Sequence, residues 1–201
     1  MKKYFLYIVI LLSVTNFSNT LFAQSTNEKS IALNNYLETI IKDTTQVVFI
    51  AKEKINSNET LNIFALNEIM IIDSDGNGKG DSTLYKKKDF EIMRDKYKNN
   101  CTAGKRFWCN DDFWTKEDFK YKKISLESMS TKKGIEVVLE KYNTADIKVY
   151  GFSEPIYYQK YIVFTVITVN MTGSKTRIII MKKIKDKWIV THKGDNSNIM
   201  N

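Results

Sequence analysis

The chain has 201 residues, of which 43% are hydrophobic and 27% charged, and its formal net charge is +8. This globular composition excludes wholesale disorder and collagen-like or coiled-coil architectures. One His and two Cys exclude a multi-His metal centre and a Cys-rich zinc module within a single chain.

Residues 1–23 have the pattern of a cleaved secretory signal peptide, with two early lysines followed by an apolar stretch. Ala23 stands before Gln24 at the expected cut, which leaves a single mature domain over residues 24–201. The apolar stretch is too short for a spanning helix, so we expect membrane contact only through this segment before cleavage. The product would be periplasmic or secreted; the alternative is that the segment stays as an anchor.

The mature chain opens with a helical pattern and continues with short strands. Residues 27–43 carry apolar side chains at helical intervals, which predicts an amphipathic helix. Short apolar runs predict three strands, at 47–51, 61–66 and 68–72. Two further stretches favour helix, 87–98 and 131–142.

The cysteines lie close together, at Cys101 and Cys109. In an exported protein an even pair of cysteines indicates a disulfide, because the compartments outside the cytosol are oxidising. The alternative is two free buried thiols.

The C-terminal half has the pattern of an antiparallel β-meander, in which long apolar runs from Lys148 onward are separated by turns. The strand at 161–171 is apolar on both faces over its first half, so both faces need cover. We expect helices on one face and a curled sheet or the aromatic loop on the other. The grouped elements predict an α+β fold with an N-terminal helix, short strands and a C-terminal meander packed against helices. A curved sheet of the nuclear-transport-factor-2-like or cystatin-like kind is one form of it.

The C-terminal half also resembles small uncharacterised exported proteins and lipoproteins of Gram-negative bacteria. Ser153 and Pro155 precede a strand, and Trp188 follows a lysine-rich one, as in those proteins. The stretch KKDFEIMRDKY resembles the short helix that they place before a Trp-bearing loop. Many relatives carry a Gly- and Cys-bearing turn where this chain has residues 171–174, so it departs from their pattern there. The resemblance implies an exported location and this fold, and it implies no activity.

The sharpest local motif is DSDGNGKGD, at residues 73–81. Its side-chain oxygens have the spacing of a calcium loop and come from Asp73, Asp75, Asn77 and Asp81. Leu84 stands where an EF-hand has its bidentate Glu, so the motif is closer to the Asp-rich calcium loops between strands of secreted proteins. Calcium is the one cofactor this sequence suggests. The alternative is a solvated hairpin, because Asp-Gly and Asn-Gly are common turn formers.

Residues 106–119 are rich in both aromatic and acidic side chains. Trp108 and Trp114 predict a ligand-binding surface, because exposed aromatic rings stack on sugar faces. Two carboxylates could also act as acid and base in an exported, glycan-directed hydrolase, with four candidates: Asp111, Asp112, Glu117 and Asp118. The alternative is that the rings cover the core beneath the disulfide loop while the acids keep the loop soluble.

No coherent catalytic set emerges from the sequence. His192 is the one imidazole, and a nucleophile elbow, a P-loop and a dinucleotide fingerprint are all missing. Acids intersperse the lysine clusters, which favours a solvated surface and no nucleic-acid partner. We therefore predict a non-catalytic binding or envelope-support domain whose partner is an envelope protein or a glycan. The alternatives are the carboxylate hydrolase and a calcium-dependent adhesin-like module.

Overall fold

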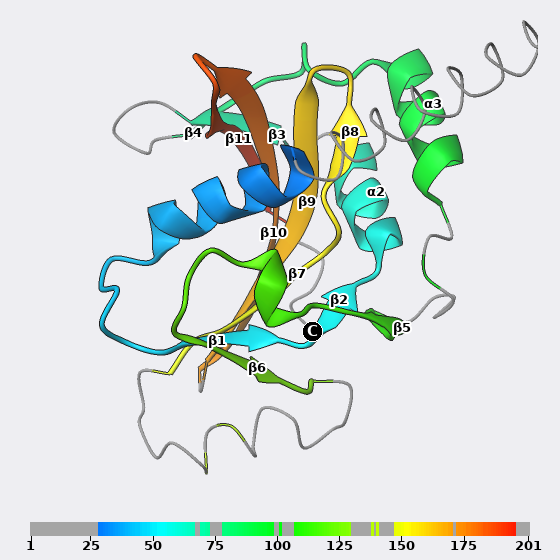
Figure 1. Cartoon of the computed structure of the whole chain (residues 1–201). Coiled ribbons are helices and arrows are strands. Elements are labelled where there is room, and N and C mark those ends of the chain that lie inside the picture. Colours follow the sequence, from blue (N-terminus) through cyan, green and yellow to red (C-terminus); the bar gives the residue numbers. More distant parts are fainter. Residues whose placement is uncertain are drawn as a thin grey trace, which may run out of the picture.

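In the described part of the chain, nine strands form one mixed β-sheet with helices packed on both faces (Figure 1). The computed structural model describes residues 28–66, 69–72, 78–98, 101, 107–129, 138, 140, 147–170 and 172–195. The predicted α+β class is confirmed.

The large sheet combines a C-terminal meander with strands from earlier in the chain. Its central path, in spatial order, is β4 (Gly78–Gly80), β3 (Ile69–Ile72), β11 (Lys187–Asp195), β10 (Gly173–Ile184), β9 (Tyr161–Asn170), β7 (Val149–Phe152), β1 (Val48–Ala51) and β6 (Ile124–Glu127). The ninth strand, β8 (Ile156–Tyr158), pairs with β9. β1 runs parallel to both of its neighbours, and the other pairings are antiparallel. The predicted meander is confirmed. A separate two-stranded sheet joins β2 (Glu53–Ile55) to β5 (Trp108–Phe113).

Strand β9 is covered on both faces, as its sequence predicts. Phe164 and its neighbours two residues away on either side belong to the core beneath the N-terminal helix, residues 28–40. Val163 belongs to the opposite core, which contains residues of α2 (Ser57–Ala65) and α3 (Lys87–Tyr97). The predicted helices at 27–43 and 87–98 are thus confirmed with small differences at their ends. Helices cover both faces, and the aromatic loop adds Trp114 and Phe119 to the core on the N-terminal helix's face.

The strand predicted at 61–66 is wrong, because this stretch belongs to helix α2. Asn56 begins the helix, since its side chain accepts a hydrogen bond from the backbone N–H of Asn58 at 3.0 Å. The buried side chains recur at helical intervals: Ser57, Thr60, Leu61 and Phe64, with Ile63 beside them. A strand with one covered face would bury alternate residues, whereas Ile63 and Phe64 are adjacent and both buried. The predicted strands at 47–51 and 68–72 are confirmed as β1 and β3, with small differences at their ends.

Ser153 and Pro155, which carry the resemblance noted above, lie where β7 gives way to β8. Both strands pair with β9, but with different halves of it. Ser153 is fully buried, and its Oγ accepts a hydrogen bond from the backbone N–H of Thr165 at 2.9 Å. It also lies 3.0 Å from the hydroxyl of Thr60 on α2. Ser153 therefore fixes the break between the strands and joins it to the helix.

Several predictions fall on parts of the chain outside the described residues. These are the signal segment 1–23 with its cleavage site at Ala23 and Gln24, and the calcium ligands Asp73, Asp75 and Asn77. Of the helix predicted at 131–142, residues 138 and 140 are described, and both are helical.

Candidate functional site

Cys101 and Cys109 form a disulfide, with their Cα atoms 5.8 Å apart. The predicted pairing is confirmed, and it indicates an oxidising, non-cytoplasmic environment. Both residues are buried, and the bond ties the chain after α3 to strand β5. Among the helices of the described residues, none has the length and apolar character needed to cross a membrane.

Trp114 lies in the core, which argues against its predicted use as a sugar platform. Its side chain is 4% exposed, and its Nε1–H donates a hydrogen bond to the carbonyl of Phe152 at 3.1 Å. The ring also lies 4.6 Å from the ammonium of Lys54 and packs against Phe119. Because these neighbours leave no open face for a sugar, Trp114 acts as a core residue.

Trp108 is half-buried and packs against strand β7. A Cβ built on Gly151 would lie 2.6 Å from the indole Cη2 of Trp108 and 2.7 Å from a methyl carbon of Ile167. The absence of a side chain at Gly151 is therefore what lets the indole approach the sheet. This position accounts for Trp108 through packing and leaves it outside the cavities described below.

Substituting Gly151 with alanine is expected to destabilise the fold by about 1–2 kcal/mol through overpacking. In a Trp108→Ala background the same change should cost less, because one of the two clashing groups is gone. Urea unfolding of the wild type, both single variants and the double variant measures this coupling. Costs that simply add would show that Trp108 and Gly151 do not interact in this way.

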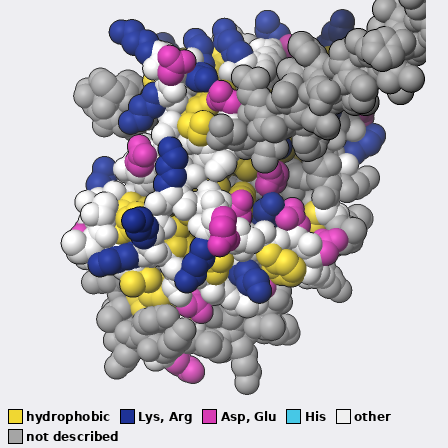
Figure 2. Space-filling view, viewed as in Figure 1, with side chains coloured by type: hydrophobic (Ala, Val, Ile, Leu, Met, Phe, Trp, Pro, Cys, Tyr) yellow, Lys and Arg dark blue, Asp and Glu magenta, His cyan; other side chains and the backbone are white. Residues whose placement is uncertain are grey.

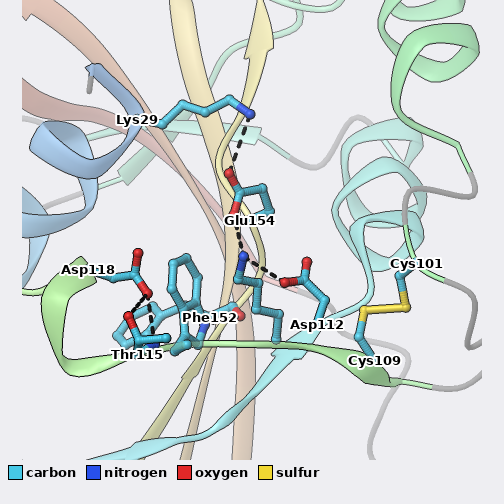
Figure 3. A network of polar contacts seen from close by, with 10 residues as sticks. Lys29, Cys101, Cys109, Asp112, Thr115, Asp118, Phe152 and Glu154 are labelled. Carbon is cyan, nitrogen blue, oxygen red and sulfur yellow. Dashed lines mark hydrogen bonds and ion pairs between the residues drawn. A yellow bond between two sulfur atoms is a disulfide. The ribbon is translucent and has the colours of Figure 1, made fainter. Parts of the chain in front are cut away.

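The acids proposed for a hydrolase do not meet in a cleft. Figure 3 shows Asp112 at one end of a chain of ion pairs: its carboxylate lies 2.9 Å from Lys54, which lies 2.9 Å from Glu154. Asp118 instead caps a short 3-10 turn, where it accepts hydrogen bonds from the backbone and hydroxyl of Thr115.

Asp111 and Glu117 are exposed, and none of the four acids lines the cavities described below. Burial of the Lys54 ammonium would lower its pKa, but Glu154 and Asp112 together raise it above its usual value. The lysine therefore stays charged and the ion-pair chain persists. Asp112 and Asp118 thus have structural partners.

Asp81 is the one predicted calcium ligand within the described residues. Its carboxylate accepts hydrogen bonds from the backbone and hydroxyl of Thr83, which lower its pKa, and it lies 3.3 Å from Nε2 of His192. Groups of three or more His, Cys, Asp or Glu side chains able to hold a metal do not occur among the described residues. Calcium binding stays a prediction.

The most distinctive open site is a cavity of about 510 Å³ where the sheet extends beyond the end of the N-terminal helix. Strand register builds its floor: Thr168 of β9 lies between Tyr150 of β7 and Lys175 of β10. Arg177 lies two residues further along β10, on the same face of the sheet and opposite Val166. Side chains in register point to the same face, so these residues project together toward the helix end.

Four cations line this cavity, from three separate parts of the chain: Lys42, Lys148, Lys175 and Arg177. Asp195 lies within 3.1 Å of Lys175 and 3.0 Å of Arg177, and so neutralises part of their charge. Lys42 and Lys148 are exposed, and neither forms an ion pair with another described residue. Among the described residues, the cavity lining therefore carries excess positive charge.

Two tyrosines add neutral hydroxyl groups to the lining. Burial raises the pKa of Tyr36 to about 12, although Arg177 acts in the opposite direction. Burial also raises the pKa of Tyr150. Both phenols therefore stay protonated at neutral pH and can donate hydrogen bonds.

A second cavity of about 490 Å³ adjoins the first and is lined in part by residues 46–49. The two cavities share four lining residues: Ile40, Lys42, Lys148 and Tyr150. We call the two adjoining cavities together the basic groove. Among the described residues that line the second cavity, Asp43 is the acidic one.

The basic groove was not predicted from the sequence. The sequence contains denser lysine runs, but they lie outside the lining of the first cavity; one of them consists of Lys182, Lys183, Lys185 and Lys187. Figure 2 shows Lys and Arg side chains spread over the described face with Asp and Glu among them. One signal was present: the face of β9 that carries Phe164 changes from apolar to polar at Thr168 and Asn170. That change marks where the helix no longer covers the sheet.

The chain is an α+β domain with a basic groove at one end of its sheet. Comparison of the chain with protein-family models, curated proteins and solved structures gave no match. The resemblance to small exported proteins and the curved-sheet analogies therefore stay predictions, and the site is argued from its own chemistry.

Proposed function

We propose that the chain is an exported, non-catalytic binding domain that holds an anionic ligand in the basic groove. The observation that carries the proposal is the lining of the first cavity by four cations with no acidic side chain among its described lining residues. Ammonium and guanidinium groups form charge-assisted hydrogen bonds with carboxylate or phosphate oxygens. A cavity of this size also has the volume typical of small-ligand sites.

The lining chemistry supports binding without catalysis. Carboxylate, imidazole and thiol groups do not occur among the described residues that line the first cavity, so no carboxylate or imidazole base is present among them to activate its hydroxyl and ammonium groups. The two tyrosines keep their protons at neutral pH and act as hydrogen-bond donors. The acids of the hydrolase alternative lie away from the groove.

Export is part of the proposal and has its own test. The disulfide supports it, because such bonds persist outside the reducing cytosol. Mass spectrometry of the protein recovered from its native cell envelope or medium should find a mature N-terminus at Gln24. An intact Met1 on a cytosolic species would contradict export.

Calorimetric titration with tripolyphosphate and with tetraglutamate tests anion binding directly. We expect binding that weakens as salt rises from 50 to 500 mM, because salt screens exposed charges. Lys148→Glu should weaken it by about tenfold or more, since it replaces an attraction with a repulsion. Lys88→Glu is the matched control, because Lys88 is exposed on α3, which packs on the opposite face of the sheet. No heat with any small polyanion, or equal losses in both variants, would contradict the proposal.

A further inference from the structure

The two halves of the basic groove meet at a pair of lysines. Lys42 follows the N-terminal helix and Lys148 precedes β7, and both line both cavities. A ligand confined to one cavity would therefore contact the same two cations as a ligand that runs through both. This shared boundary favours an extended ligand whose negative charge is distributed along its length.

Neutral polar groups accompany the cations throughout the first cavity. Besides the two tyrosines, hydroxyl and amide side chains come from the helix end and from the adjoining ends of β9 and β10: Thr39, Thr168, Asn170, Thr172 and Ser174. Hydroxyl and amide groups can both donate and accept hydrogen bonds. The hydroxyls of Thr39 and Thr172 already donate, to the Tyr36 carbonyl and to the Asn170 side-chain oxygen, and so face a ligand as acceptors. A ligand that matches the lining must therefore carry hydroxyl groups as well as negative charge.

We infer that the basic groove binds an acidic oligosaccharide, a chain of uronic-acid residues, which passes between Lys42 and Lys148 and occupies both cavities. This inference rests on the proposed anion-binding function and names its ligand class. Each uronate carries one carboxylate for a cation and several hydroxyls for the neutral groups. Its apolar ring face can also lie against Tyr150, which belongs to both cavities.

Other polyanions match the lining less completely. A polyphosphate offers charge and acceptor oxygens at every position but no donor for the lone pairs of a hydroxyl such as that of Thr168. An acidic peptide offers carboxylates without neighbouring hydroxyls. A neutral oligosaccharide would leave Lys42 and Lys148 without a charged partner.

Oligogalacturonates of defined length test the inference, measured by calorimetry in buffer that a chelating resin has freed of divalent cations, so that no such cation bridges the sugar to the protein. The affinity should rise from the monomer to the length that fills both cavities and then level off. Malto-oligosaccharides of the same lengths should bind at least tenfold more weakly, because they lack the carboxylates.

Variants divide the groove into its parts. Lys42→Gln and Lys148→Gln should weaken every oligogalacturonate that binds, by about tenfold each, because these lysines serve both cavities. Lys175→Gln removes a cation of the first cavity only and should weaken short and long oligomers alike if short ones bind there. Val47→Glu adds a negative charge to the second cavity, where Val47 is 51% exposed, and should weaken only the long oligomers. Lys88→Gln should change nothing, and matching urea midpoints would show that each variant folds.

The outcomes separate the inference from the proposed function. Binding of tripolyphosphate or tetraglutamate without oligogalacturonate would overturn the inference and keep the anion-binding function. An affinity that does not change with oligomer length, or Val47→Glu acting on the monomer, would overturn the extended binding mode. Absence of binding to every anion would overturn both.

Discussion

Replacing Phe64 with alanine is expected to destabilise the protein by about 3–5 kcal/mol, the range for removing a fully buried aromatic ring. Phe64, on helix α2, has no exposed surface and lies at the centre of a group of aromatic side chains. Its ring centroid lies 4.6 Å from that of Tyr158 and 6.1 Å from that of Phe90, with which it stacks. The substitution would leave a cavity between rings from α3 and β8, and urea unfolding would measure the loss of stability.

Phe113→Ala is the matched control, because it makes the same chemical change at a ring that is 40% exposed. Phe113 contacts the ammonium of Lys52 at 5.2 Å, a cation–π contact worth about 0.5–1 kcal/mol at an exposed site. We expect its loss to cost no more than that. If both variants lost the same stability, α2 would not pack on the sheet as described.

Helix α2 also shows where local sequence patterns are ambiguous. The apolar residues Leu61, Ile63 and Ala65 alternate as they would in a strand, while Leu61 and Phe64 have helical spacing. A short apolar run fits both periods, and the surroundings decide between them. Here the Asn56 cap begins a helix, and the face of the sheet that contains Val163 and Ile178 buries both Ile63 and Phe64. The polar residues at 56–58, of types that are also common in turns, here begin the helix.

The longer elements could be predicted because their patterns persist over many residues. β9 is buried along most of its length on both faces. The tight turn between β10 and β11 has positive φ at both Lys185 and Asp186, as a two-residue hairpin of type I′ requires. By contrast, the parallel placement of β1 between β6 and β7 joins segments far apart in the chain. No local period specifies which distant strand a short apolar run will join.

The basic groove could not be predicted for the same reason. Its cations come from residue 42, residue 148 and the start of β10, and only strand register and the end of the N-terminal helix bring them together. The sequence instead draws attention to dense local motifs. Of these, the aromatic and acidic stretch is explained by packing and ion pairs: Trp114 donates to Phe152, and Asp112 pairs with Lys54. The aromatic and acidic residues that the sequence suggested for binding or catalysis thus stabilise the fold. The cavity is lined instead by cations that lie far apart in the sequence.

Removing the disulfide by the double substitution Cys101→Ala and Cys109→Ala is expected to lower the free energy of unfolding by about 2.5 kcal/mol, on the chain-entropy model for a short loop. The two cysteines are eight positions apart, and both are buried, so alanine leaves no unpaired polar group behind. The bond acts mainly by restricting the unfolded chain. The urea dependence of unfolding should therefore become steeper in the variant, because its unfolded state exposes more surface.

Reduction supplies the control for this prediction. Dithiothreitol should lower the urea midpoint of the wild type toward that of the double variant and leave the variant itself unchanged. A wild-type midpoint that does not respond to full reduction would show that the bond adds no stability. Any stability that the double variant loses would then come from removing the buried sulfur atoms, because they pack between the chain after α3 and strand β5.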